Sequence, residues 1–486
     1  LMKQHQRMSP IVAGSLACLL GSLPLLAQAD DNSRYTFSGF ASFGVAKSLE
    51  RDEPFGSVGD EIPYKTEYRD FNKLGLRVTA DLYDNLTFTT QMVALGHNDF
   101  EPEFDWIFAS YNLNPNLVLH VGKYVTSYYM YSDYSDISYA YHWVSAPDAV
   151  YGQNLNKSLD GAKLVWNARM GSWVSELSLL IGEDKADMSS IGLATDIVLQ
   201  NATGLAWQIE RDWLMLRASY MQSTTSAELA NTQLGDDGLL AAVTPQFTAA
   251  GGVYDQLEAA ALLSPAIPDE FTSAAGTAAL NAALNSTSAA DFRYTLGSWD
   301  KADSMFVGFG TSMNFDPLFV IAEITHVQFD DALVLGNQTA GYLTFGSHLP
   351  GNTAIALTLY ERHNNTNKEY VESLTASYNQ LISAAMPEAM AEVATELGLD
   401  LLDPADQATA AQIAGVALGA FSGALEPLVD GSQKNRRRGA TLSGRWDFHS
   451  NAALKVEYLY EHYQQTRRTP NKTTPQAVRV GIDLAF

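Results

Sequence analysis

The sequence is poor in cysteine and in basic residues, and both shortages narrow the possibilities. Its 486 residues include one cysteine, Cys18, and 30 Lys and Arg against 55 Asp and Glu. Without a disulfide framework, the stability of the chain has to come from a large core or a large closed hydrogen-bond network. The formal charge of −25 argues against nucleic acid as a partner, because a phosphate backbone needs a basic surface. The mean hydropathy of −0.09 is too polar for a bundle of membrane helices.

The first 29 residues predict a signal peptide. Lys3 and Arg7 precede an apolar stretch from Ile11 to Leu26, and Ala27-Gln28-Ala29 is the small-x-small pattern that precedes cleavage. The alternative is an N-terminal membrane anchor, but acidic and polar residues follow the apolar stretch at once. We therefore expect export and a mature chain of residues 30–486, which no longer contains the cysteine.

Hydrophobic residues alternate with polar ones along most of the remaining chain. At the C-terminal end, for example, Val478, Val480, Ile482, Leu484 and Phe486 alternate with Arg479, Gly481, Asp483 and Ala485. A period of two predicts strands with one apolar and one polar face. About sixteen segments follow this pattern, most of them long enough for a tilted strand to cross a bilayer, which takes about 9–11 residues. They are residues 35–47, 70–83, 85–97, 103–113, 116–127, 158–169, 172–183, 201–211, 212–223, 299–315, 317–331, 337–349, 351–364, 436–449, 450–465 and 475–486.

The connections between these segments are of two kinds. Tight turns such as Asp84-Asn85, Gly171-Ser172 and Pro350-Gly351 fall at every second junction, and the other junctions are loops of widely varying length. Short turns on one side and long loops on the other are typical of bacterial outer-membrane barrels. The strands have to close on themselves, because an open edge in lipid leaves unpaired backbone groups. We predict an all-β fold, a transmembrane antiparallel β-barrel of about 16 strands in the bacterial outer membrane.

Four features give the chain a family resemblance. They are the leader, the number of strands, a long loop of about residues 128–157 after the fifth strand, and the terminal Phe486. With the stretches Leu119-His120-Val121-Gly122-Lys123 and Ser145-Ala146-Pro147-Asp148-Ala149-Val150-Tyr151-Gly152, the chain resembles the sixteen-stranded trimeric porins of Gram-negative bacteria.

The resemblance implies a homotrimer in contact with outer-membrane lipid and lipopolysaccharide, which lets small hydrophilic solutes and ions diffuse passively and needs no cofactor. It also implies that the loop folds inward and narrows the pore, and that Phe486 is part of an assembly signal. The Pro-Glu-Phe-Gly-Gly motif of the enterobacterial loops is absent, so the constriction residues of the family cannot be transferred one by one.

Residues that would line a pore follow from the alternation and the loop. If the apolar parity faces lipid, the charged side chains of the other parity belong to a wet lumen, since charges on the lipid face are costly. The barrel is then a water-filled pore or, alternatively, a plugged barrel with internal salt bridges. Tyrosines of the loop would form a stacking track for sugars or simply pack the loop against the wall. The pore-wall basic candidates are Lys73, Arg77, Lys163, Arg217, Arg437 and Arg445, and the constriction candidates are Asp133, Asp136, Tyr139, Tyr141 and Asp148.

Two Ala-rich insertions, about residues 224–292 and 364–434, interrupt the β pattern. Residues Glu369 to Leu402 predict a helix that Pro387 punctuates, and both insertions are expected outside the cell. They would form a lid over the mouth, bind a partner or a divalent ion, or shield the barrel. We assign no metal site, because acids in loops commonly serve only solvation.

Other functions have weaker support in the sequence. Common catalytic motifs such as His-Glu-x-x-His and Gly-x-Ser-x-Gly are absent, so we do not expect an enzyme. The best catalytic lead is His326 with Asp330 and Asp331 near a strand end, since some outer-membrane proteases use such residues at the rim. A channel selective for a sugar or another nutrient, and an adhesin or receptor that works through the insertions, are the further alternatives.

Overall fold

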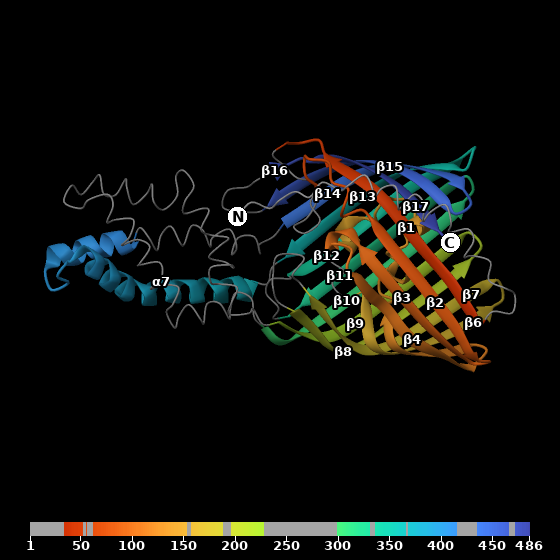
Figure 1. Cartoon of the computed structure of the whole chain (residues 1–486), viewed down its shortest axis with the longest axis horizontal. Coiled ribbons are helices and arrows are strands. Elements are labelled where there is room, and N and C mark those ends of the chain that lie inside the picture. The colour runs from red at the N-terminus through yellow and green to blue at the C-terminus, as the bar shows by residue number, and fades with distance from the viewer. Residues whose placement is uncertain are drawn as a thin grey trace.

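The computed structural model describes residues 34–51, 55, 62–152, 157–187, 196–227, 299–330, 336–365, 368–415, 435–465 and 472–486. These residues form one closed antiparallel β-barrel with a helical extension at one end (Figure 1). The prediction of an all-β barrel of sixteen long strands is confirmed. The strands are β1 (Tyr35–Ser48), β2 (Lys73–Tyr83), β3 (Leu86–Leu95), β4 (Pro102–Asn114), β5 (Leu117–Val125), β6 (Ser158–Met170), β7 (Trp173–Asp187), β8 (Asp196–Arg211), β9 (Leu214–Ala227), β10 (Trp299–Phe315), β11 (Leu318–Phe329), β12 (Asn337–Leu349), β13 (Thr353–Asn365), β14 (Asn435–His449), β15 (Ala452–Gln465) and β17 (Gln476–Ala485), with the two-residue β16 (Lys472–Thr473) beside β15.

The barrel closes between its first and last long strands. Each strand pairs with its neighbours in the sequence, and β1 pairs with both β2 and β17, where Phe43 lies opposite Ile482. The terminal Phe486 extends this seam, because its backbone N–H and C=O both bond to Gly39. A side chain at Gly39 would collide with the Phe486 ring, which lies 2.6 Å from the position of a Cβ atom. The end of the chain is thus built into the closure.

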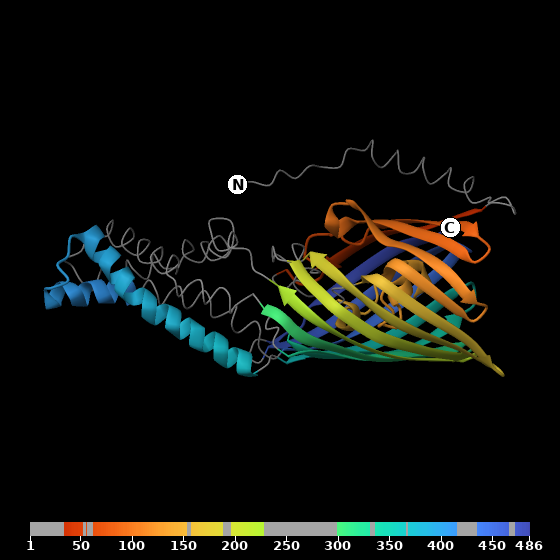
Figure 2. The same ribbon diagram turned by 90° about the horizontal axis from the view of Figure 1, so that it is seen from below.

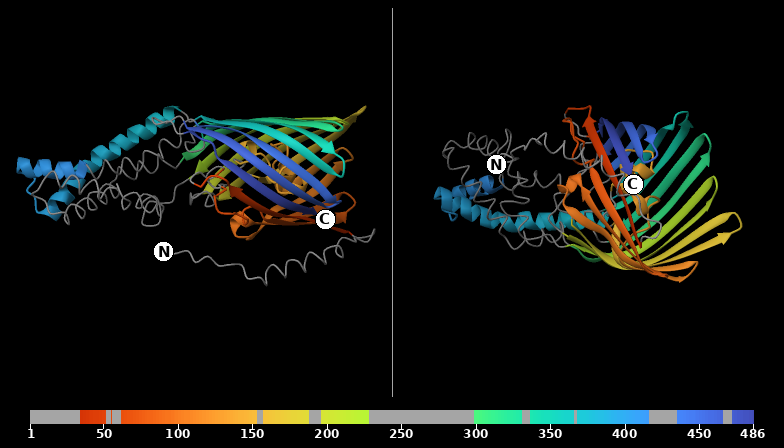
Figure 3. Two further views of the ribbon diagram at one scale, coloured as in Figure 1. Left: turned by 90° about the horizontal axis from the view of Figure 1, so that it is seen from above. Right: turned by 45° about the vertical axis from the view of Figure 1, so that its right-hand side comes forward.

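Short turns lie together at one end of the barrel, which we call the turn end, and the longer loops lie at the opposite loop end (Figure 3). Gly171 and Gly351 adopt positive φ angles of 64° and 82° in the expected turns after β6 and β12, a conformation that glycine adopts without strain. Several strand boundaries differ from the prediction: β7 continues to Asp187 and β8 begins at Asp196, whereas the sequence predicted 172–183 and 201–211. β9 continues to Ala227, so the first insertion does not start at residue 224. Residues 224–227 pair with β8 and β10 although they lack apolar alternation.

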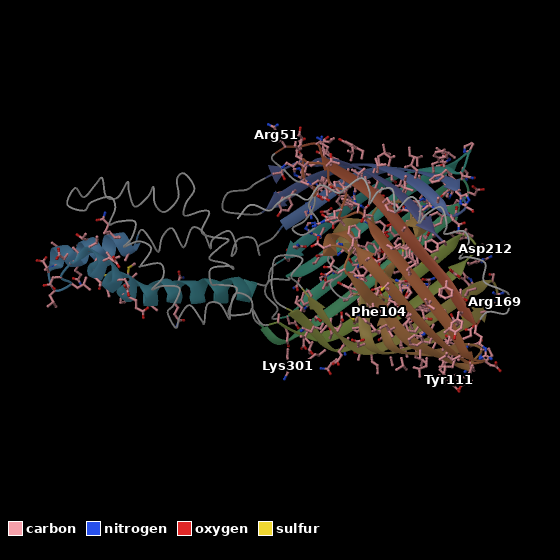
Figure 4. The ribbon with its side chains drawn as sticks, viewed as in Figure 1. Arg51, Phe104, Tyr111, Arg169, Asp212 and Lys301 are labelled. Carbon is pink, nitrogen blue, oxygen red and sulfur yellow. The ribbon has the colours of Figure 1, made fainter. Side chains whose placement is uncertain are left out.

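Burial in the barrel is inverted relative to a soluble protein. On β15, Lys455 and Glu457 are 0% and 1% exposed, whereas Val456 and Tyr458 between and beside them are 49% and 41% exposed. The same alternation places apolar side chains outside and charged ones inside around the barrel. Aromatic side chains are exposed near the turn end, where Figure 4 labels Tyr111. This set includes Tyr83, Tyr111, Trp166, Trp213, Phe315 and Trp446. An apolar band with an aromatic girdle is the exterior of a barrel in a bilayer.

A helical extension leaves the loop end after β13 (Figures 1 and 2). Helix α7 spans Lys368–Leu397, includes Pro387, and ends where Gly398 takes a φ of 66° and the Leu399 N–H bonds to the Ala394 carbonyl. A shorter helix follows at 404–415. In the described part of the chain, no helix has both the length and the apolar character needed to span a membrane. The predicted leader, residues 228–292 of the first insertion and the rest of the second lie outside the described residues.

Candidate functional site: a loop folded into the barrel

The described part of the connection between β5 and β6, residues 126–152 and 157, folds into the barrel, and we call it the inner loop (Figure 2). It contains the short helices η3 (Ser132–Tyr134), η4 (Ser138–Ala140) and α2 (Asp148–Tyr151). Its α2 lies against β11, β12 and β13, and its η4 lies against β1 and β17. The inner loop therefore reaches wall strands far from the two that it connects, as the long loop of the sequence was expected to do.

Glu323 of β11 anchors both ends of the inner loop. One of its carboxylate oxygens accepts a 2.7 Å hydrogen bond from the Met130 backbone N–H, and the other accepts a 2.5 Å bond from the Tyr151 hydroxyl. The Tyr342 hydroxyl of β12 donates to the second oxygen as well, at 3.2 Å. This acid is buried, and the three donors supply the hydrogen bonds that water would supply to an exposed carboxylate.

A second group of wall residues holds the middle of the inner loop. Lys455 of β15 donates a hydrogen bond to the Trp143 carbonyl at 2.8 Å and another to the Ser138 carbonyl. The backbone N–H of Val144 donates to Glu457 at 3.1 Å, and the Trp143 indole N–H donates to Thr358 of β13 at 2.8 Å. Trp143 is thus fixed from two strands.

Arg445 and the turn between β14 and β15 hold the inner loop near the turn end. The guanidinium of Arg445 donates to the carbonyls of Tyr139 and Tyr141 at 2.9 and 2.8 Å, and it pairs with Asp447 at 2.7 Å. The Tyr139 hydroxyl donates to the Ser450 carbonyl in the β14–β15 turn at 2.8 Å. The inner loop therefore extends through the barrel from its loop end to its turn end.

The three acids of the inner loop that the sequence singled out all lie against basic side chains. Asp133 is 3.6 Å from both Lys163 of β6 and Arg217 of β9. Asp136 is 3.0 Å from Lys157 at the end of the inner loop. Asp148 is 3.6 Å from Arg437 of β14, whose other partner is Glu461 at 2.7 Å.

These ion pairs control the protonation of the inner loop. Burial by itself raises the pKa of the Asp133 carboxyl, but Lys163 and Arg217 outweigh it and hold the pKa below its usual value. For Asp136, burial also raises the pKa, but the charges of Lys157 and Lys73 lower it by more, so the net shift of the pKa is downward. In turn Asp136 raises the pKa of Lys157. Both acids are therefore ionised at neutral pH.

Four of the six basic candidates on the wall touch the inner loop rather than facing it across water. Lys163 donates to the Ser127 hydroxyl at 2.6 Å and Arg217 to the Ser127 carbonyl at 2.8 Å, in addition to the contacts of Arg437 and Arg445 described above. The acids and bases on this side of the lumen are thus paired in direct contact rather than separated across the opening. The charges of this side of the lumen are largely compensated.

Lys73 and Arg77 of β2 make no ion pair with the described part of the inner loop, although Lys73 lies near enough to Asp136 to lower its pKa. Arg77 donates to the Gln91 side chain at 2.8 Å and lies 4.1 Å from the Trp106 ring centroid. Gln91 in turn donates to Asp105 at 3.0 Å. These side chains come from β2, β3 and β4, and they form a polar network to which the described part of the inner loop contributes no hydrogen bond.

The aromatic rings of the inner loop pack against the wall and one another. Tyr131 lies 5.8 Å from Trp143, which lies 5.5 Å from Tyr342 of β12. Tyr141, a constriction candidate, is 2% exposed and donates to the Ser135 carbonyl, so its side chain packs within the inner loop. Burial also argues against a sugar track made of these rings. Three rings, those of Tyr134, Tyr139 and Tyr151, are only half-buried.

A cavity of about 730 Å³ opens at the turn end between the inner loop and β12–β14. Its lining includes His142, His348, Arg445 and Asp447. The His142 ring stacks on Phe319 with ring centroids 4.2 Å apart. Burial, and then the nearby Arg445 and His348, lower the pKa of His142 to about 3, so this imidazole is neutral at pH 7.

His326, the histidine of the catalytic lead at the strand end, does not face the lumen. His326 shares the parity of the lipid-exposed Ile324 on β11, and its Nδ1 lies 2.8 Å from the Thr339 hydroxyl. Asp330 accepts a hydrogen bond from Gln328, and Asp331 lies outside the described residues. Within the described ranges, no three His, Cys, Asp or Glu side chains form a group that could hold a metal ion.

Glu323 and Trp143 are among the anchors of the inner loop, and the sequence did not identify them as site residues. Alternation placed Glu323 on the inner face, but nothing in a single strand indicates that it meets the inner loop. The path of the inner loop brings the Tyr151 hydroxyl to Glu323 beside that of Tyr342, so this cluster cannot be recognised from the sequence alone.

Comparisons with solved structures found several proteins of bacterial outer membranes. The chain is similar to outer-membrane expressed OmpT of Vibrio cholerae, with 8% identity over 94% of this chain and 100% of that chain and a TM-score of 0.47. It is similar to the outer membrane channel DcaP of Acinetobacter baumannii, with 12% identity over 93% and 97% and a TM-score of 0.46. An anion-selective porin from Comamonas acidovorans shares 11% identity over 93% and 99%, with a TM-score of 0.46. No family model and no curated protein matches the chain.

Proposed function

We propose that this protein is an outer-membrane porin, a channel through which small hydrophilic solutes and ions diffuse passively. The observation that carries the proposal is the inverted burial of the closed barrel, with Lys455 and Glu457 inside and Val456 and Tyr458 outside. In a closed ring of strands the backbone N–H and C=O groups within the lipid bond to one another. A charged lumen wall is suited to water and polar solutes.

The inner loop is the narrowing element in this proposal. It is bound to the wall through Glu323, Glu457, Lys455 and Arg445, so the remaining path runs beside a fixed obstacle. Because its acids are paired with bases, selectivity depends on the small excess of charge left along the path, including Lys73 and Arg77. Transport needs no cofactor or energy coupling.

Localisation and assembly follow from the same proposal. Residues 1–29 direct export, the turn end lies in the periplasm, the loop end with α7 lies outside the cell, and Phe486 forms part of an assembly signal. The barrel works as a homotrimer surrounded by outer-membrane lipid. Size-exclusion chromatography with light scattering of the detergent-solubilised protein measures the assembly, and a monomeric mass would contradict it.

Planar-bilayer recording tests the channel directly. The purified full chain should produce stable conductance steps that scale with salt concentration. Denatured protein and the detergent alone are the controls. Protein that inserts into the bilayer but passes no current would contradict the proposal. Saturable block of the current by a sugar would instead indicate a substrate-selective channel.

A further inference from the structure

A β-bulge in β4 turns two consecutive side chains toward the inner loop. Gln91 of β3 lies opposite Trp106, and the next residue of β3 lies opposite Phe104, so Asp105 is an extra residue in β4. Phe104, labelled in Figure 4, is exposed on the outside of the barrel, whereas Asp105 is half-buried and Trp106 is 9% exposed. Bulges redirect side chains in this way.

A small cavity of about 10 Å³ lies where the inner loop meets this part of the wall. One water molecule needs about 10–15 Å³, so the cavity is too small for an organic solute and large enough for a single water molecule or a small ion. Its polar lining comes from Gln91, Asp105 and Trp106 of the wall and from Ser132, Ser135, Asp136 and Lys157 of the inner loop.

The indole N–H of Trp106 has no hydrogen-bond acceptor within the described part of the chain. The Nε1 atom is buried, and the side chain that carries it lines the cavity. Buried N–H groups of native proteins are almost always bonded to another protein group or to ordered water. We therefore expect an acceptor for this N–H inside the cavity.

The charged groups at the cavity are held by contacts of their own. Gln91 donates to one carboxylate oxygen of Asp105 at 3.0 Å, and the Lys157 ammonium group lies 3.0 Å from one carboxylate oxygen of Asp136. The Lys157 carbonyl accepts hydrogen bonds from the backbone N–H and the hydroxyl of Thr126 at 3.0 and 2.9 Å. Two acids and one base thus line the cavity from fixed positions.

Charge and hydrogen-bonding capacity favour water over an ion in this cavity. An anion would accept from Trp106 and Lys157 but would lie beside two carboxylates, and a cation would meet an N–H group and an ammonium group. A water molecule accepts two hydrogen bonds and donates two. It can therefore accept from the indole and the ammonium group and donate to the two carboxylates.

We propose that one buried water molecule occupies this cavity and joins the inner loop to β3 and β4. The wall network of Arg77, Gln91 and Asp105 then gains a link to the inner loop through the water. Glu323 and Lys455 hold the inner loop on strands that are distant from β3 and β4, so the water adds an attachment on a separate part of the wall. The consequence rests on the proposed function: solutes do not pass between the inner loop and β3–β4.

A crystal structure of the detergent-solubilised full chain tests the site directly. The electron density should contain one isolated peak within hydrogen-bond distance of Trp106 Nε1 and of the Asp105 and Asp136 carboxylates. A cavity without such a peak would overturn the inference. An anomalous peak in the cavity after soaking with bromide or with rubidium would overturn it as well, because it would show an anion or a cation site instead.

A thiol beside the cavity measures whether the water closes the gap. Cys18 lies in the predicted leader and is the only cysteine of the sequence, so Ser135→Cys gives the exported chain a single thiol. Adding Trp106→Phe removes the N–H and keeps a ring beside Arg77. The reaction with a small charged thiol reagent should become about fivefold faster, the factor that one hydrogen bond of ordinary strength is worth.

Trp207→Phe in the same Ser135→Cys background is the matched control. Trp207 is exposed on the outside of β8, and its indole N–H donates to Ser175, so the thiol should react as in the unaltered background. Equal rates in the Trp106 and Trp207 variants would contradict the proposed link.

Bilayer recording tests the consequence for transport. Trp106→Phe should conduct more than Trp207→Phe, and equal conductance would show that solutes are not limited at this contact. Neither the electron density nor the thiol reaction requires an open channel. A failed channel proposal and a failed water site can therefore be told apart.

Discussion

The Tyr151 hydroxyl donates a 2.5 Å hydrogen bond to the Glu323 carboxylate, and this contact ties the last helix of the inner loop to the barrel wall. The same carboxylate receives the Met130 N–H from the start of the inner loop. One wall acid thus fixes both ends of the segment that narrows the lumen. We therefore expect the position of the inner loop to depend on this acid.

Replacing Glu323 by alanine should loosen the inner loop while leaving the barrel closed. Three buried donors, from Met130, Tyr151 and Tyr342, lose their acceptor, and each unsatisfied buried group costs about 1–3 kcal/mol. We expect noisier single-channel currents and faster proteolysis within residues 126–157. Thr325→Val is the matched control, because Thr325 is buried on β11 and makes no side-chain hydrogen bond to the described part of the inner loop. Quiet currents in Glu323→Ala would show that the anchor is dispensable.

Neutralising the inner-loop acids should move the ion preference toward anions. The Asp133→Asn, Asp136→Asn double variant leaves Lys163, Arg217 and Lys157 without their ionised partners, so the path gains positive charge. The reversal potential in a salt gradient measures this shift. Asp303→Asn at the outer rim removes a charge away from the inner loop and should leave the potential where it was. An unchanged potential in the double variant would mean that these acids lie off the path of the ions.

The sequence was sufficient for the barrel because the strands alternate over most of their length and most of the short turns contain a glycine, proline or asparagine. These are local signals, and they predicted the inward position of Lys163, Arg217 and Arg437. At β9 the signal failed, since residues 224–227 are polar on both faces and are held by pairing with β8 and β10. Above the apolar band, strand pairing no longer requires alternation.

The interior of the inner loop was less predictable for a physical reason. Its acids and bases were identified by type, but the partner of each depends on contacts between residues far apart in the chain, such as Asp148 with Arg437. Tyr141 illustrates the limit. A tyrosine in a polar loop is compatible with exposure or burial, and only the path of the chain past Trp143 and Tyr131 decides that it is buried.

Acidification should weaken the attachment of the inner loop through His142. Burial, with Arg445 and His348, lowers the pKa of His142 from an ordinary value of 6.5 to about 3. The detached loop would bind a proton near pH 6.5 while the attached loop stays neutral, so the stabilisation is complete above pH 6.5 and is lost as pH falls toward 3. Protease sensitivity of the inner loop should rise over this range. His142→Phe keeps a ring against Phe319 and should remove this part of the pH dependence, and an identical pH profile in both proteins would contradict the assignment.

Lys455 and Asp483 test how far the barrel depends on charge buried in its lumen. The Lys455 ammonium group is fully buried, lies 2.8 Å from the Asp483 carboxylate and also donates to the carbonyls of Ser138 and Trp143. Lys455→Met leaves that carboxylate and both carbonyls without their donor, and breaking a buried pair in this way costs about 3–5 kcal/mol. Denaturant unfolding in detergent micelles measures the loss.

The double variant Lys455→Met, Asp483→Leu separates the pair from the loop contacts. It removes the uncompensated carboxylate, because a hydrophobic replacement of both partners is often neutral for stability, but it still lacks a donor for Ser138 and Trp143. We expect it to regain most of the free energy of unfolding while its inner loop remains more sensitive to protease than in the original chain. If the single and double variants unfold at the same denaturant concentration, then the stability that Lys455 contributes comes from its hydrogen bonds to the loop carbonyls rather than from the ion pair with Asp483. The inner loop is in that case the main stabilising partner of this wall.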